Sequence, residues 1–73
     1  MNRICTVMVH NSADELGLSN SCFAKLTAAE AVEKMTEHIT KELRLRVEGT
    51  LSTEDCELLD GWQKSTGKQL TPV

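Results

Sequence analysis

The chain has 73 residues and a mass of 8.1 kDa, which is enough for one small domain and too little for two. Eleven Asp and Glu against eight Lys and Arg give a net charge of −3, the wrong sign for nonspecific attraction to nucleic-acid phosphates. A charged fraction of 26%, with four Gly and one Pro, argues against wholesale disorder.

The three cysteines, Cys5, Cys22 and Cys56, cannot all pair within the chain, and their wide spacing is unlike the framework of small secreted domains. We expect reduced, buried, structural thiols. The first residues lack the uninterrupted apolar stretch and cleavage site of a signal peptide, and no run approaches the roughly 18 apolar residues of a membrane span. These features predict a cytoplasmic protein.

Residues 3–10 are predicted to form a strand, because β-branched and apolar residues alternate over two faces. Apolar side chains on both faces suggest an inner position in a sheet. If this strand instead lies at an edge, a partner segment can add to it as a further strand. The polar residues 10–15 predict an exposed loop.

Residues 21–26 are predicted to form a short second strand, with Phe23 and Lys25 opposite Leu26. The next four residues have the spacing of a capping box, in which Thr27 and Glu30 each bond to the other's backbone. A helix is therefore expected to begin at Ala28.

Apolar residues recur at spacings of three and four through this helix, from Ala28 to Ile39 and Leu43. Glu37 and Lys41 have the order and spacing of a favourable ion pair on its polar face. From Leu43 the period changes to two, which predicts a half-exposed strand through Val47. The alternative is that the helix continues through residues 44–47 and the protein is mainly helical.

A second helix is predicted after residue 51, capped by Ser52 or Thr53, with acidic residues in its first turn. Leu58, Leu59 and Trp62 are expected to face the core. Because Gly61 weakens a helix by about 1 kcal/mol relative to alanine, this helix is predicted to be short and to end around Ser65.

The predicted fold is an α+β domain, with a small sheet of two or three strands backed by one long and one short helix. The domain is expected to span residues 1–66, and residues 67–73 are expected to form a flexible C-terminal tail.

Enzyme, metal and cofactor chemistry are not expected. The cysteines, His10 and His38 lack the spacing of a metal site, and there is no GxGxxG, GxxxxGK[ST] or GxSxG motif. The acidic residues at positions 54–60 are those expected near a helix start. Phe23 and Trp62 are the only aromatic residues, which is too few for a surface that stacks nucleic-acid bases.

Protein binding needs no motif and remains the favoured function class. Arg44 and Arg46 share the solvent face of the predicted third strand, where their guanidinium groups suit carboxylates of a partner. Lys41 adds to this basic cluster. Arg3 and Phe23 complete the set of candidate partner-binding residues, Phe23 as an anchor if it is exposed.

The length, the acidic balance and the opening residues Met1-Asn2-Arg3-Ile4-Cys5 resemble a class of small bacteriophage proteins that bind host RNA polymerase, including a regulator made by a Xanthomonas phage. The resemblance implies a protein of the host cytoplasm that binds polymerase subunits, inhibits initiation and promotes antitermination. It implies no small-molecule substrate, no membrane and no required DNA contact.

Two other functions remain open. The acidic chain can inhibit another host system, such as a nuclease-based defence or a toxin, by occupying a basic cleft. Alternatively, Lys41, Arg44 and Arg46 can bind nucleic acid directly.

Overall fold

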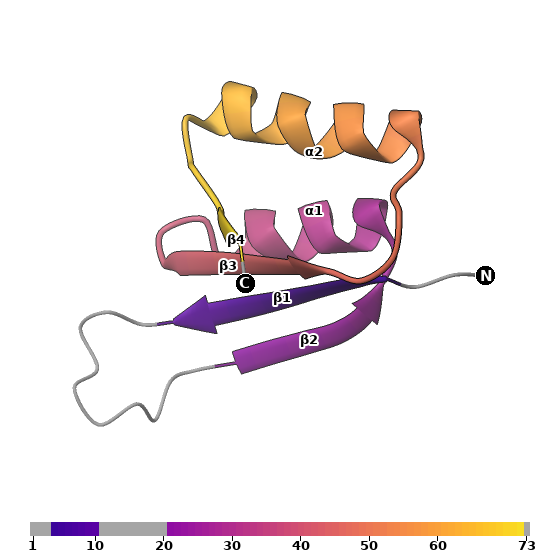
Figure 1. Cartoon of the computed structure of the whole chain (residues 1–73). Coiled ribbons are helices and arrows are strands. Elements are labelled where there is room, and N and C mark those ends of the chain that lie inside the picture. Colours follow the sequence, from indigo (N-terminus) through magenta and orange to yellow (C-terminus); the bar gives the residue numbers. More distant parts are fainter. Residues whose placement is uncertain (1–3, 11–20, 73) are drawn as a thin grey trace.

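The computed structural model describes residues 4–10 and 21–72. They form a single sheet with two helices stacked on the same side of it, so that the opposite face of the sheet is left open (Figure 1). The α+β class predicted from the sequence, a small sheet backed by two helices, is confirmed. A short fourth strand adds to the two or three strands that were predicted.

The sheet has the strand order β2-β1-β3-β4. Strand β1 (Cys5–His10) pairs antiparallel with both β2 (Ser21–Leu26) and β3 (Glu42–Val47). The inner position expected for β1 is therefore confirmed, and the alternative in which β1 is an edge strand is wrong. Arg3, with which the predicted strand began, lies outside the described residues.

Strand β2 contains a bulge that changes which side chains face the core. Val7 pairs with Phe23 and Cys5 pairs with Leu26, so β2 uses one residue more than β1 over this stretch. Lys25 takes up the extra length with a φ of 59°, a left-handed conformation uncommon for a side chain of this type. As a result Phe23 and Leu26 both pack against the core, whereas strict alternation predicted that they lie on opposite faces.

Helix α1 (Ala28–Glu37) begins where the sequence predicts. The Glu30 amide donates to Thr27 Oγ1 and the Thr27 amide donates to Glu30 Oε1, each at 3.2 Å, which completes the capping box. The helix ends at Glu37. Lys41 was predicted to lie on its polar face, but it lies beyond the end of the helix. The ion pair of Glu37 is instead with Lys34, at 3.5 Å.

The change of period at Leu43 does mark a strand, β3, and the mainly helical alternative is wrong. Leu43 and Leu45 of β3 are buried, while Arg44 and Arg46 between them are exposed. Ile39, placed in the helix by its spacing, lies in the turn between α1 and β3 and still packs against the core.

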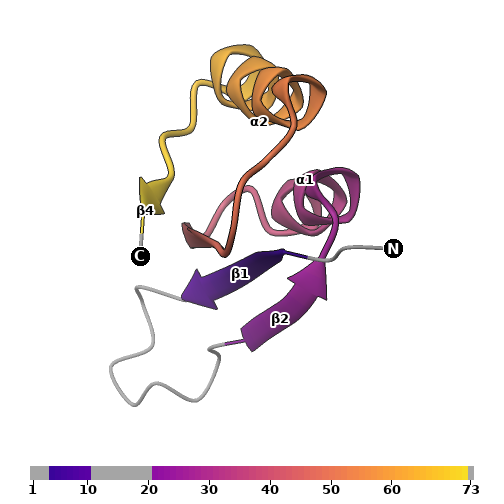
Figure 2. The ribbon, with the colours of Figure 1, turned by 45° about the vertical axis from the view of Figure 1, so that its right-hand side comes forward.

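Helix α2 (Thr53–Thr66) lies beside α1 and is seen end-on with it in Figure 2. Ser52 caps it by accepting from the Asp55 amide at 3.2 Å. With 14 residues it is longer than the 10-residue α1, so the prediction that the second helix is the short one is wrong. The cost of Gly61 to helix stability is offset by the packing of Leu59 and Trp62 in the core. Leu58 was predicted to face the core, but its side chain is 40% exposed.

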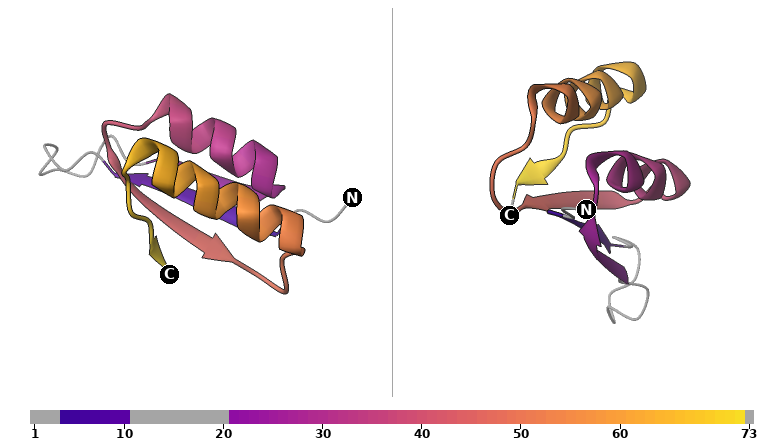
Figure 3. Two further views of the ribbon diagram at one scale, coloured as in Figure 1. Left: turned by 90° about the horizontal axis from the view of Figure 1, so that it is seen from above. Right: turned by 90° about the vertical axis from the view of Figure 1, so that its right-hand side faces the viewer.

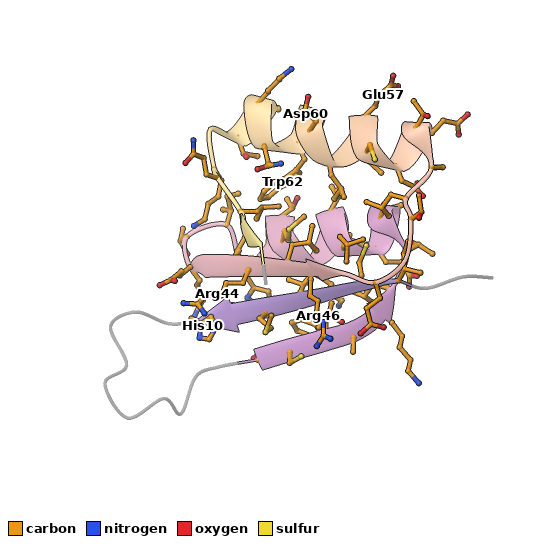
Figure 4. All side chains as sticks on the ribbon, viewed as in Figure 1. His10, Arg44, Arg46, Glu57, Asp60 and Trp62 are labelled. Carbon is orange, nitrogen blue, oxygen red and sulfur yellow. The ribbon has the colours of Figure 1, made fainter. Side chains whose placement is uncertain are left out.

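Trp62 fixes α2 to α1. Its indole N–H donates to Thr36 Oγ1 at 2.9 Å, and Thr36 in turn donates to the Val32 carbonyl at 2.8 Å. Figure 4 shows the Trp62 side chain pointing from α2 toward the interior.

Residues 67–72 return to the sheet, which differs from the predicted flexible tail. Gly67 ends α2 with a φ of 72°, a conformation that glycine adopts without strain. Leu70 packs against the core, and β4 (Thr71–Pro72) pairs parallel with Arg44 and Leu45 of β3. The views in Figure 3 show this segment descending from α2 to the edge of the sheet.

The ammonium group of Lys68 ties this returning segment to the turn after α1. Its Nζ donates to the Ile39 carbonyl at 2.9 Å and also to the Lys41 carbonyl. Both acceptors lie in the connection that leads into β3. One side chain therefore joins the two chain segments that flank that end of the sheet.

Replacing Lys68 by methionine is expected to lower the free energy of unfolding by about 1–3 kcal/mol, because two part-buried carbonyls lose a charged donor. Urea unfolding measures the change. Lys64→Met is the matched control, since Lys64 makes only an exposed pair with Asp60 and is expected to change stability by about 0.5 kcal/mol or less. Equal effects of the two substitutions would contradict the prediction.

The core lies between the covered face of the sheet and the two helices. Within the described residues, no helix is of the length and apolar character required to cross a membrane. The buried apolar residues come from all three long strands and both helices: Cys5, Val7, Val9, Leu26, Ala28, Ala31, Met35, Leu43, Leu45, Leu59 and Trp62.

Candidate functional site

Neither helix covers the second side of the sheet, here called the open face, which is described from residues 4–10 and 21–72. Residues of β1 alternate between buried and half-buried, so Thr6, Met8 and His10 point away from the helices. The pairing of β1 with β3 places Arg46 opposite Thr6 and Arg44 opposite Met8. The open face comprises Thr6, Met8, His10, Cys22, Glu42, Arg44 and Arg46.

The two arginines dominate the open face. Arg44 is 3.5 Å from Glu42, and Arg46 is 3.6 Å from Glu48. All four side chains are about half exposed or more, and exposed pairs of this kind contribute little stability. The guanidinium groups therefore remain able to exchange these carboxylates for those of a partner. Figure 4 shows Arg44 beside His10 at one end of the sheet and Arg46 farther along β3.

Charge is segregated between the two layers of the protein. Helices α1 and α2 together carry seven acidic and two basic side chains, whereas the other described residues carry five basic and two acidic ones. Glu57 and Asp60 lie on the side of α2 that is away from the sheet (Figure 4). The net charge of −3 therefore conceals an acidic helix layer and a basic sheet layer.

The structure brings only part of the predicted partner-binding set together. Arg44 and Arg46 share the open face, and Lys41 lies just before β3 and is half-buried. Phe23 is on the opposite side of the sheet, where its ring stacks on His38 with centroids 5.8 Å apart and lies 5.1 Å from Lys34 Nζ. Phe23 is thus not an anchor on the surface that carries the arginines.

The open face also contains residues that were not predicted to bind a partner. Met8, Thr6 and His10 join the arginines only through the register between β1 and β3. The available signal was the alternation within residues 3–10, which separates these three side chains from the buried valines. This alternation gives no information about which strand pairs with β1, and so it cannot place Arg44 and Arg46 beside these residues.

The cysteines are not all buried, contrary to the expectation. Cys5 is fully buried, and burial raises the pKa of its thiol, with nearby Asp55 contributing in the same direction. Cys22 and Cys56 are exposed, and all three thiols are free. The residues that the structure describes include no group of three or more histidine, cysteine and acidic side chains arranged to hold a metal ion.

The exposed thiols of Cys22 and Cys56 are expected to react quickly with an aromatic disulfide reagent in the native state. Cys5 is expected to react at least about a hundredfold more slowly, because it must first be exposed by unfolding. The release of chromophore at neutral pH measures the number of fast thiols, and urea is the control that exposes the third. Three equally fast thiols without urea would contradict the burial of Cys5.

The chain matches no protein-family model, and no curated protein or solved structure is significantly similar to it.

Proposed function

We propose that the protein is a non-enzymatic regulator that binds another protein through the open face of its sheet. The observation that carries this proposal is that no helix or strand of the described residues covers the face, which presents Arg44 and Arg46 around the half-buried Met8. Exposed guanidinium groups beside a thioether and a short polar side chain suit an acidic protein surface with apolar parts.

The first partner to test is bacterial RNA polymerase, because the chain resembles small phage regulators of that enzyme. Such a protein acts in the host cytoplasm. By occupying a surface that the initiation factor needs, it lowers the affinity of that factor and inhibits promoter-dependent initiation. At a terminator the bound protein hinders formation of the RNA hairpin, and transcription continues.

The test uses the full chain with purified polymerase core enzyme and holoenzyme. Isothermal titration calorimetry is expected to give saturable binding, and a transcription assay is expected to show less promoter-dependent initiation and more readthrough at an intrinsic terminator. The assay without added protein is the reference. No binding to either form, together with unchanged transcripts, would refute polymerase as the partner.

The acidic helix layer favours a second candidate function, inhibition of a host nuclease or toxin through a basic cleft. Glu54, Glu57 and Asp60 are exposed on α2, on the layer opposite the arginines. In that case Glu54→Gln with Glu57→Gln weakens binding, while Arg44 and Arg46 are not needed. The two candidates therefore require different faces of the same domain.

Direct binding to nucleic acid is the outcome to be excluded in parallel. The basic sheet layer favours it, but the open face carries no aromatic side chain, since Phe23 and Trp62 both lie on the helix side. A gel shift with duplex and single-stranded probes at moderate salt is expected to show no complex.

A further inference from the structure

An apolar pocket opens at the edge of the sheet where β3 passes under α2. Its volume is about 250 Å³, and it is lined by Leu45, Val47, Leu59, Gln63 and Leu70. Among the described residues that line it, Gln63 has the one polar side chain, and its Oε1 accepts from the Leu70 amide at 3.3 Å. The pocket therefore presents mainly hydrocarbon to anything that enters it.

The pocket arises because α2 is held against α1 and not against the end of β3. The Trp62–Thr36 hydrogen bond joins α2 to α1. On the sheet side, β4 pairs with Arg44 and Leu45, and Val47 is left 38% exposed at the end of β3. Val47 is one of two large apolar residues, with Leu58, that the described part of the chain exposes to this extent.

Consecutive side chains of β3 lie alternately at the pocket and on the open face. Leu45 and Val47 line the pocket, whereas Arg44 and Arg46 project from the open face on the other side of the same strand. Strand β4 occupies this edge beside Arg44 and Leu45. A ligand that passes around the edge at Arg46 and Val47 can therefore contact the Arg46 guanidinium and the pocket together. The successive side chains are only one strand residue apart, a rise of about 3.3 Å.

We propose that the pocket receives one large apolar side chain, leucine or phenylalanine, from an acidic segment of the partner protein. Charge complementarity identifies the segment, because the cationic groups next to the pocket along β3 are Arg44 and Arg46. Size identifies the anchor, since an apolar cavity of about 150 Å³ already accepts a benzene ring. The proposal rests on the proposed function in taking the partner to be acidic.

The acidic residues of α2 do not oppose this arrangement. Asp60, the acid closest in sequence to Leu59, is 3.0 Å from Lys64 and lies on the side of α2 away from the sheet. Carboxylates of the bound segment accordingly meet the arginines of β3 and not the outer surface of α2.

The experiment titrates the ¹⁵N-labelled full chain with three synthetic peptides, Asp-Glu-Asp-X-Asp-Glu-Asp, in which X is leucine, phenylalanine or serine. Amide shifts at Val47, Leu59 and Leu70 report the pocket, and shifts at Arg44 and Arg46 report the open face. The leucine and phenylalanine peptides are expected to bind at least about tenfold more tightly than the serine peptide, because an apolar side chain is removed from water.

The variant Val47→Ser is expected to remove this tenfold preference and to leave binding of the serine peptide unchanged. Leu58→Ser is the matched control, since Leu58 has nearly the same exposure, 40% against 38%, and does not line the pocket.

Three results would overturn the proposal. Equal affinity of the leucine and serine peptides means that the pocket takes no anchor. Shifts at Val47 and Leu70 that grow with protein concentration, without peptide, mean that a second copy of the chain occupies the pocket. Loss of the preference in Leu58→Ser means that the anchor lies elsewhere. Failure of all three peptides to shift Arg44 and Arg46 instead refutes the acidic partner of the proposed function.

Discussion

Replacing Met35 by alanine is expected to lower the free energy of unfolding by about 2–5 kcal/mol. Met35 is fully buried and is among the largest such side chains, on the face of α1 that packs against the sheet. The loss combines the transfer of its side chain to water with the cavity left behind. In a domain whose total stability is about 5–15 kcal/mol, that is a large fraction. Urea unfolding followed by the fluorescence of Trp62, the single tryptophan, measures it.

The control for this prediction is Leu58→Ala, which removes a comparable side chain from a position that is 40% exposed. Its expected effect is about 0.5 kcal/mol or less. If Met35→Ala does not fold, Met35→Leu keeps most of the volume and is expected to cost less than about 1.5 kcal/mol. Equal destabilisation by Met35→Ala and Leu58→Ala would mean that the packing of α1 on the sheet is not as described.

The elements that sequence reasoning predicts well are those fixed by local chemistry. The Thr27–Glu30 capping box places the start of α1, and the change from a helical to a two-residue period places β3. The start of α2 was predicted to within one residue, since Ser52 or Thr53 was expected to cap it and Ser52 does. Each signal lies within a few residues of the structure it specifies, so no tertiary information is needed.

The parts that were mispredicted depend on contacts between distant segments. Residues 67–72 are polar in composition, and their return to the sheet is set by Leu70 in the core and by Lys68 on the turn after α1. The bulge in β2 exists only relative to β1, because it is defined by a mismatch between the two strands. The relative helix lengths also depend on such contacts: α2 ends at Thr66, close to the predicted end, but α1 ends at Glu37 although the apolar spacing continues to Leu43.

The candidate site also has a part that local sequence patterns predict and a part that depends on contacts between distant segments. Alternation within β3 is sufficient to predict that Arg44 and Arg46 share one face. The addition of Met8 and His10 requires the register of β1, and the separation of charge into two layers requires the whole fold. The pocket beside Val47 depends on the position of α2, which no local pattern specifies.

Reversing both arginines of the open face, Arg44→Glu with Arg46→Glu, is expected to weaken binding to the proposed partner, RNA polymerase, at least about a hundredfold. Like charges then face the partner's carboxylates, and the favourable electrostatic steering is lost. Folding is expected to be affected little, because both side chains are about half exposed and their ion pairs with Glu42 and Glu48 are weak. Calorimetric titration against purified RNA polymerase at two salt concentrations measures the loss, and the wild-type affinity is expected to fall as salt rises.

The matched control is Lys34→Glu with Lys64→Glu, which changes the net charge by the same amount but on the helix layer. If binding responds to position, the control pair leaves the affinity within a few fold of the wild type, since those lysines lie on the opposite layer from Arg44 and Arg46. If both pairs weaken binding equally, the partner senses only the total charge of the domain, and the open face is not the binding surface. Tighter binding by the helix-layer variant, with no loss in the arginine variant, would instead assign binding to the acidic helices, because the substitutions add negative charge to that layer.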